Sequence, residues 1–535
     1  MMKLFKKTDS ILILLIIVSA LTKLMLLGEG MFSNPDEWRY KHSLNACNKL
    51  FEGNVTDCIV SIFSTDARPG EVIIKMIPAS VQILVSKIFN LNILEPLAFL
   101  PVYIFNYIIL IIISILHYKF SFLLSKNRLI SLFSVLLFSL FVNSFVYLRH
   151  TFPYDISLLL GYYTVYNICK YEINSYYSKK RLISIGLIAF FSYLIYPGYL
   201  PVFFISLGIL IFHKFNITPL KNIVNKVFYF GLGASILLFI TELLSRSVSK
   251  SYLINSLVLS DTIKQGNFDE TLLFPVKYLL SVEGITGIAL IILLSLTIYY
   301  SLKNINKIDN VFSIYNIIIY GCLFFVLIHG IAGVFFYKVV FYGRLFHQYL
   351  PFLVLISSSM LIRYLRYKWI DALLIMVSMV LFIQYIIQIN LILNVGYPRD
   401  YSWKLIKQNG YKSIDQYYGL NFAHTAVPKL SEELNPIGTF CEIDTINSNF
   451  VENSLKTKLL VNACFVLPSV SGSYYYLPHD VKNNKYNYIE DSVNHYVNLP
   501  AYQFEGYKKD ERDFLTTCRL KMYLIGTSSK SSRLD

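Results

Sequence analysis

The sequence predicts a polytopic α-helical membrane protein that ends in a smaller, more polar domain. Of its 535 residues, 55% are hydrophobic and only 15% are charged, whereas soluble proteins carry about 25% charged residues. Apolar runs of about 18 residues recur through the first three quarters of the chain, and each is long enough to cross a bilayer. We therefore expect a transmembrane part over residues 1–394 and an extramembrane α/β domain over residues 395–535.

Apolar runs predict about eleven spans. The first run follows a basic flank, as in a signal peptide, but it has no clear small-x-small cleavage site, so we interpret it as a retained helix. We place the spans near residues 11–27, 97–117, 129–147, 156–171, 182–196, 199–213, 227–244, 284–301, 311–333, 346–362 and 370–393.

The basic residues predict the orientation. The net charge is +15, and the segments between spans that we assign to the inside hold 18 Lys and Arg. The outer segments hold 13, although they are about twice as long. This bias puts the N-terminus in the cytoplasm and the C-terminal domain outside, in the periplasm of a bacterial inner-membrane protein. No basic stripe marks a soluble module, so we expect no nucleic-acid partner.

Two outer loops are long, at 28–95 and 245–281. Within the first, residues 72–89 are apolar but carry Lys75 and Lys87, so we predict an interfacial helix whose lysines snorkel to water. Lys23 is expected to snorkel in the same way, and Glu242 is expected to pair with Arg246 one turn later.

The tail and the cysteines suit an outer compartment. The stretch "YSWKLIKQNG" predicts a short helix, and "KLLVNACFVLP" and "LKMYLIG" predict strands. Five of the seven cysteines lie in outer segments, which fits a compartment that permits disulfides. Cys47 and Cys58 share one loop and are the favoured bridge.

Charged and polar residues gather in the outer segments. Such groups near lipid usually line a cavity and pair with each other or with a ligand. Arginine can hold a phosphate through two parallel hydrogen bonds, and a carboxylate can take a proton from a hydroxyl. The candidate catalytic residues are Asp36, Glu37 and Asp155. The candidate substrate- or phosphate-binding residues are Arg39, Arg68, Arg149, His150, Arg344 and His347.

Structural roles compete with these assignments. Asp155 could simply cap the helix that follows it, because Asp is a favoured N-cap residue. Arg68 could be a surface charge, and Arg344 and His347 could be interfacial anchors. Asp36 and Asp155 could also hold Mg²⁺ or Mn²⁺, which prefer oxygen ligands.

Three motifs resemble those of the GT-C class of membrane glycosyltransferases. "NPDEWRY" looks like their Asp-Glu-x-Arg-Tyr stretch after the first helix, with Asp36 at the base position. "DARPGE" is similar to their basic-Pro-Pro segment, with Arg68 at the cation position, although Gly70 replaces the second proline. "RHTFPYD" resembles their acidic motif of the second outer loop, which contributes Asp155. The layout is similar to that of protein O-mannosyltransferases, aminoarabinose lipid A transferases and O-antigen glucosyltransferases.

The resemblance implies an inverting transfer at the outer leaflet. The donor would be a sugar on a polyprenyl phosphate or pyrophosphate, and the acceptor a glycan, a lipid or a protein. Some members of the class need a divalent metal. Three other classes stay open: a flippase or transporter for lipid-linked sugars, an O-antigen polymerase or ligase, and a sensor with a C-terminal ligand domain.

Overall fold

The computed structural model describes most of the membrane part and the strands of the tail. The described residues are 2–28, 37, 39–64, 68–91, 93, 97–174, 178–215, 218–263, 272–303, 310–336, 346–360, 369–393 and the five strands. Asp36 and Arg344, two of the predicted site residues, and the predicted helix at 401–410 lie outside them.

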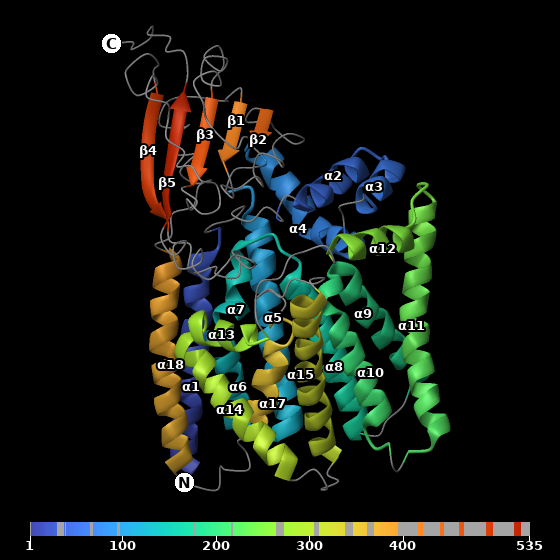
Figure 1. The fold of residues 1–535 in the computed structure, drawn as a ribbon, viewed down its shortest axis with the longest axis vertical. Coiled ribbons are helices and arrows are strands. Elements are labelled where there is room, and N and C mark those ends of the chain that lie inside the picture. The colour runs from blue at the N-terminus through green and yellow to red at the C-terminus, as the bar shows by residue number, and fades with distance from the viewer. Residues whose placement is uncertain are drawn as a thin grey trace.

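The described part of the chain is a helical membrane protein (Figure 1). Six helical segments are long and apolar enough to span a bilayer: Thr8–Leu26, Leu97–Ser125, Leu220–Arg246, Gly284–Lys303, Val311–Ala332 and Ala372–Asn390. A seventh candidate is the broken pair Arg128–Leu140 and Val142–Arg149, which bends by 80°. The polytopic class is therefore confirmed.

A helix lies at each of the eleven predicted spans, although the number of crossings stays a prediction. These helices are α1 (Met2–Lys23), α5 (Leu100–Ser125), α6 (Arg128–Leu140), α8 (Tyr154–Asn174), α9 (Lys179–Ile195), α10 (Leu200–Phe212), α11 (Leu220–Arg246), α14 (Gly284–Lys303), α15 (Asn310–Phe336), α17 (Leu350–Met360) and α18 (Trp369–Leu393).

The predicted outer loops also contain helices. The first loop forms α2 (Tyr40–Phe51), α3 (Val55–Ile62) and α4 (Pro69–Ile88), and the second forms α12 (Tyr252–Ile263) and α13 (Phe274–Ser281). The helices α2, α3 and α4 lie together at the end of the bundle opposite the N-terminus (Figure 1). In α2 and α3 the polar and apolar residues separate onto two faces, so one face can pack while the other meets water.

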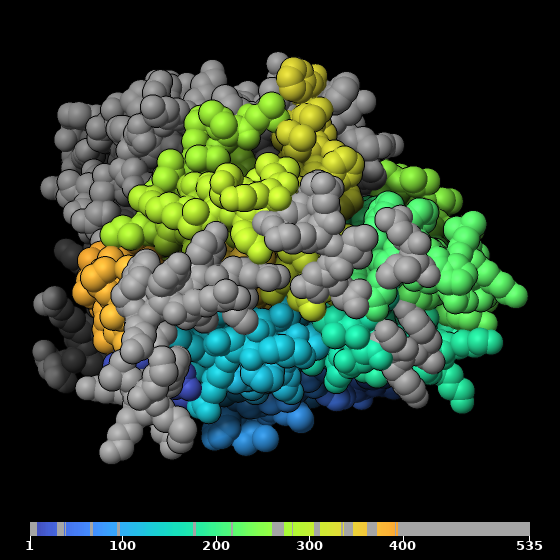
Figure 2. All heavy atoms as spheres, turned by 90° about the horizontal axis from the view of Figure 1, so that it is seen from below, coloured from blue at the N-terminus to red at the C-terminus, as the bar shows by residue number. Residues whose placement is uncertain are grey.

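Helix α6 forms the centre of the bundle. Its residues from Leu129 to Leu140 are all buried, and α1, α5, α17 and α18 pack around it. Seen from the N-terminal end, α18 and α11 lie on opposite sides of the molecule (Figure 2). The pair α9 and α11 packs closely because Gly186 meets the carbonyl of Phe230 and Gly233 meets that of Ile183. Small residues permit such close backbone approach between membrane helices.

The tail contains a five-stranded mixed sheet with the order β2-β1-β3-β5-β4. The strand β1 (Gln416–Leu420) runs parallel to β2 (Thr439–Glu442) and β3 (Leu459–Cys464), whereas β5 (Cys518–Ile525) is antiparallel to β3 and β4 (Tyr488–His495). The two predicted strands are confirmed as β3 and β5. Parallel neighbours require crossover connections; the α/β character of the tail stays a prediction, because only its five strands belong to the described residues.

Two predicted lysine environments are wrong. Lys75 lies on the inner face of α4 and is 3% exposed. Its amine does not reach water but donates hydrogen bonds to Glu71 and to the carbonyl of Thr151. Lys23 is 1% exposed and donates to the carbonyl of Ser139 on α6. By contrast, Arg246 Nε pairs with Glu242 at 2.7 Å, as predicted.

Candidate functional site

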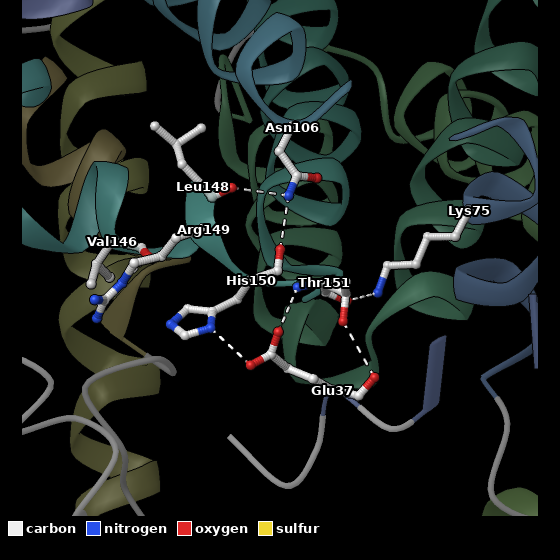
Figure 3. A network of polar contacts seen from close by, with 8 residues as sticks. All are labelled: Glu37, Lys75, Asn106, Val146, Leu148, Arg149, His150 and Thr151. Carbon is white, nitrogen blue, oxygen red and sulfur yellow. Dashed lines mark hydrogen bonds and ion pairs between the residues drawn. The ribbon is translucent and has the colours of Figure 1, made fainter. Parts of the chain in front are cut away.

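The site begins where α6 breaks at Phe141. The chain continues as α7 (Val142–Phe145) and the 3₁₀ turn η3 (Val146–Arg149), which leads to His150 and Thr151. Asn106 of α5 holds this segment, because its Nδ2 donates to the carbonyls of Leu148 at 3.2 Å and His150 at 2.8 Å (Figure 3). A polar residue within an apolar span thus satisfies backbone carbonyls that lack helical partners.

Glu37 joins this segment to the chain that follows α1. Its carboxylate accepts a hydrogen bond from His150 Nδ1 at 2.9 Å and another from the backbone N–H of Thr151 at 3.0 Å (Figure 3). The Thr151 hydroxyl donates to the Glu37 carbonyl at 3.3 Å. Because a carboxylate only accepts, Nδ1 of His150 carries the hydrogen. Glu37 is 0% exposed, so its two oxygens brace the loop.

The surroundings of His150 disfavour its charged form. Burial lowers its pKa below the usual 6.5, and this effect outweighs the opposite influence of Glu37. With Nδ1 bound to Glu37, Nε2 keeps its lone pair and is an acceptor. In its neutral form His150 is therefore suited to orient a hydroxyl group through Nε2, and its predicted phosphate-binding role stays a prediction.

A chain of charges connects α4 to the same loop. Lys75 Nζ binds Glu71 at 2.6 Å as well as the Thr151 carbonyl, and Arg68 Nη1 lies 3.7 Å from the other Glu71 oxygen. The Arg68 guanidinium stacks over the ring of Tyr196, with 4.5 Å from its central carbon to the ring centroid. Burial also lowers the pKa of Lys75, against the pull of Glu71. Arg68 is 15% exposed, so its cation is anchored but accessible.

Close packing explains why residue 70 is glycine. A Cβ at Gly70 would lie 2.6 Å from the backbone nitrogen of Ile195, at the end of α9. Any larger residue, the proline of the GT-C motif included, would push α4 away from α9. Gly70 thus lets the helix that carries Arg68, Glu71 and Lys75 approach the bundle.

Arg149 is the second cation of the site. Its side chain is 0% exposed, and Nε donates to the carbonyl of Val146 at 3.3 Å. An arginine keeps its charge even when it is buried. It therefore contributes a fixed positive charge next to His150.

Asp155 and His347 face one another from the first turn of α8 and from the turn that precedes α17. Asp155 Oδ1 and His347 Nε2 lie 3.1 Å apart, both side chains are buried, and neither atom completes a hydrogen bond in the described structure. Nδ1 of His347 instead bonds the hydroxyl of Tyr199. The distance would permit an ion pair but the geometry does not complete a hydrogen bond. We therefore regard Asp155 and His347 as two polar groups in close contact that are not hydrogen-bonded to each other.

Aromatic rings lie between the two groups of polar residues. Phe152 packs against His150 and against Tyr154, each at 5.0 Å between centroids. Tyr147 meets the His347 ring edge-on at 4.9 Å. Such ring contacts, tilted for Phe152 and edge-on for Tyr147, favour particular ring orientations, so the loop from Arg149 to Asp155 is held by aromatic packing as well as by hydrogen bonds.

The structure thus brings together most of the predicted site residues that it describes. Glu37, Arg68, Arg149 and His150 share one network, and the contact of Asp155 with His347 adjoins it. Arg39 stands at the N-terminal end of α2 and is half-buried. The sequence analysis missed Asn106, Lys75 and Tyr199. For Asn106, the available signal in the sequence was a single asparagine within an apolar run.

The predicted disulfide is not formed. Cys47 and Cys58 are free, buried thiols. Cys47 Sγ donates to the carbonyl of Met76 at 3.3 Å, and Cys58 packs in a separate apolar cluster with Ala46 and Val72. The two side chains therefore have partners other than each other.

A metal site stays a prediction. No group of three or more potential His, Cys, Asp or Glu ligands occurs within the described ranges. Asp155 and His347 offer one oxygen and one nitrogen, two of the roughly six donors that an Mg²⁺ ion takes. The other proposed ligand, Asp36, lies beyond these ranges.

The chain was also compared with known proteins. No family model matches it, and no curated protein matches it.

Proposed function

We propose that the protein is a GT-C-type glycosyltransferase that moves a sugar from a polyprenyl-phosphate or pyrophosphate carrier to a glycan, lipid or protein acceptor. One observation carries the proposal. Arg68, Arg149, Glu37 and Asp155 come from three separate segments, and they gather at one end of a membrane bundle. A buried arginine and a partly exposed one beside carboxylates suit a substrate that carries an anionic phosphate and a reacting hydroxyl.

The proposed reaction is a single displacement. Asp36 takes the proton of the acceptor hydroxyl while that oxygen forms a bond to the anomeric carbon of the sugar. The bond from this carbon to the phosphate oxygen breaks, and its electron pair leaves with the phosphate. Arg68 and Arg149, with Arg344, stabilise the negative charge that develops on the phosphate.

The carboxylates have distinct roles in this proposal. Both oxygens of Glu37 are occupied by His150 and Thr151, so Glu37 braces the loop and leaves proton transfer to Asp36. Asp155 lies in the first turn of α8, where the helix dipole favours a negative charge. With His347, it would orient the acceptor or join Asp36 in holding Mg²⁺ or Mn²⁺.

The compartment follows from the same proposal. The site would face the outer leaflet of a bacterial inner membrane, with a cytoplasmic N-terminus and a periplasmic tail. The sheet of the tail lies at the same end of the molecule as α2, α3 and α4 (Figure 1). A tail in this position could recognise the acceptor.

Transfer can be tested with purified protein in lipid nanodiscs. A panel of polyprenyl-phosphate sugars serves as donor, and the release of polyprenyl phosphate is measured in the presence of membrane glycolipid extracts. We expect release that falls at least about a hundredfold in Asp36→Asn. Glu242→Gln, at a carboxylate paired with Arg246 on α11, is the matched control. Equal release by wild type and Asp36→Asn would reject the proposed base.

A specific observation also favours a lipid-linked-sugar transporter. Such proteins use broken helices and intramembrane charges, and the structure has a broken α6–α7 pair with Lys23 and Glu283 buried near the break. The inverted repeats of that class are not evident in the sequence. In sealed vesicles, a transporter would move donor lipid between leaflets without releasing polyprenyl phosphate.

A further inference from the structure

The break between α6 and α7 is surrounded by buried polar groups that no step of the proposed reaction uses. Glu283, which directly precedes α14, is 0% exposed. Its carboxylate accepts hydrogen bonds from the backbone N–H of Val142 at 2.7 Å and of Asn143 at 2.9 Å. The hydroxyl of Tyr278 donates to it at 3.2 Å. The backbone amides freed by the break are therefore satisfied by a side chain 140 residues away.

A basic side chain lies on the other side of the break. Lys23 Nζ donates to the carbonyl of Ser139 at 2.7 Å and to its hydroxyl at 2.6 Å. It also bonds Ser19 at 3.2 Å. A basic group thus meets the carbonyl end of α6, and an acidic group meets the amide end of α7. This placement agrees with the direction of the helix dipoles.

Glu283 is itself held in place by α18. Gln384 Nε2 donates to the Glu283 carbonyl at 2.6 Å, and Gln384 Oε1 accepts from the N–H of Thr286 at 3.1 Å. Gly284 adopts φ of +58°, and a Cβ there would lie 2.7 Å from Gln384. This turn therefore depends on glycine, and it fixes the direction of the Glu283 side chain.

We infer that Glu283 and Lys23 are positioning residues that hold the break in α6 and so set the place of the loop from Arg149 to Thr151. The path is short and continuous. The amides that Glu283 binds begin α7, and α7 runs through η3 directly to Arg149. The loop then meets Glu37 through His150 and Thr151. The effect on transfer rests on the proposed function, whereas the effect on the loop does not.

Hydrogen exchange measured by mass spectrometry on the full chain in nanodiscs tests this inference. We expect Glu283→Gln to accelerate exchange across residues 142–151 by on the order of tenfold, because one of two charge-assisted acceptors becomes a donor. Glu283→Asp keeps both carboxylate oxygens. The backbone amides of residues 142–151 should therefore exchange more slowly in this variant than in Glu283→Gln. A packing role would produce the reverse order, because Gln fills the same volume as Glu and Asp does not.

Glu242→Gln is the matched control for this experiment. Glu242 also accepts a backbone N–H, that of Leu253 at 3.0 Å, but it lies on α11. We expect its substitution to accelerate exchange near α12 and to leave residues 142–151 unchanged.

Three outcomes are informative. Faster exchange that reaches residues 149–151 in Glu283→Gln, and in Lys23→Met, supports the inference. Faster exchange confined to residues 142–145 would overturn it, because Glu283 would then act only locally. If wild-type protein released no polyprenyl phosphate but the exchange result held, the proposed function would fail while the positioning role stood.

Discussion

Glu37 accepts a hydrogen bond from Nδ1 of His150, although the two residues are 113 positions apart in the chain. The contact is fully buried, and the Thr151 amide shares the same carboxylate. The contact joins the segment that follows α1 to the loop that follows η3. Two motifs that the sequence suggested separately are thus joined by buried hydrogen bonds.

Removal of this carboxylate should destabilise the fold. Glu37→Ala leaves the His150 and Thr151 donors unsatisfied in a buried site, so we expect a loss of about 3 kcal/mol in the free energy of unfolding. Denaturation monitored in detergent measures it. Glu52→Ala removes an exposed pair with Lys49 and should cost no more than about 0.5 kcal/mol. A small loss for Glu37→Ala would show that the brace is weak.

Acid should weaken the protein through His150. Its pKa is lowered in the folded state by burial, so below about pH 6.5 the unfolded chain binds a proton that the folded chain does not. Stability therefore falls as the pH falls from about 6.5 towards the lowered pKa. The difference in unfolding temperature between about pH 7.5 and about pH 5 should be smaller in His150→Gln than in wild type. An unchanged difference would contradict the assignment.

Arg68 should matter for its shape as well as its charge. We expect Arg68→Ala to slow release of polyprenyl phosphate about a hundredfold. Arg68→Lys should be intermediate, because lysine keeps the charge but loses the planar stacking on Tyr196. Arg246→Ala, at an exposed arginine of α11, is the control. Wild-type rates in both Arg68 variants would remove this residue from the phosphate site.

Cys47 and Cys58 should behave as buried thiols. Burial raises the pKa of Cys47 to about 12 and also raises that of Cys58, so little reactive thiolate forms near neutral pH. We expect slow maleimide labelling of the native protein and full labelling of both after denaturation without reductant. Labelling that required a reductant would reveal the disulfide that the loop spacing suggested.

Gly70 should tolerate no side chain. Gly70→Ala would force a methyl group against the backbone at Leu194 and Ile195, so we expect a loss of about 1–3 kcal/mol from overpacking. Gly231→Ala is the matched control, because no atom lies within 4 Å of a Cβ at that position. The unfolding midpoints of the two variants should therefore differ clearly. Equal midpoints would mean that α4 can shift without cost.

The candidate site divides into what the sequence could predict and what it could not. The predicted outer position of polar residues along the chain was enough to select Glu37, Arg149, His150, Asp155 and His347 as one group. Their partners were not predictable, because Asn106, Lys75 and Tyr199 reach the group from other segments. Lys75 shows why. Its apolar surroundings suggested a side chain that snorkels, whereas Glu71 and Thr151 satisfy its charge inside the protein.

The sequence by itself determined the class of the molecule and its local elements. Long apolar runs carry enough transfer free energy to specify membrane helices whatever their neighbours. A helix lies at each predicted span, although the span predicted at 129–147 is broken at Phe141. The pair Glu242 and Arg246 is likewise local, one turn apart on α11. Only the tertiary structure decided which buried polar groups meet. It left Cys47 and Cys58 unbridged, and it joined Glu37 to His150 and Glu283 to the break in α6. The reason is that a buried donor or acceptor must find a partner, and here that partner lies more than 100 residues away.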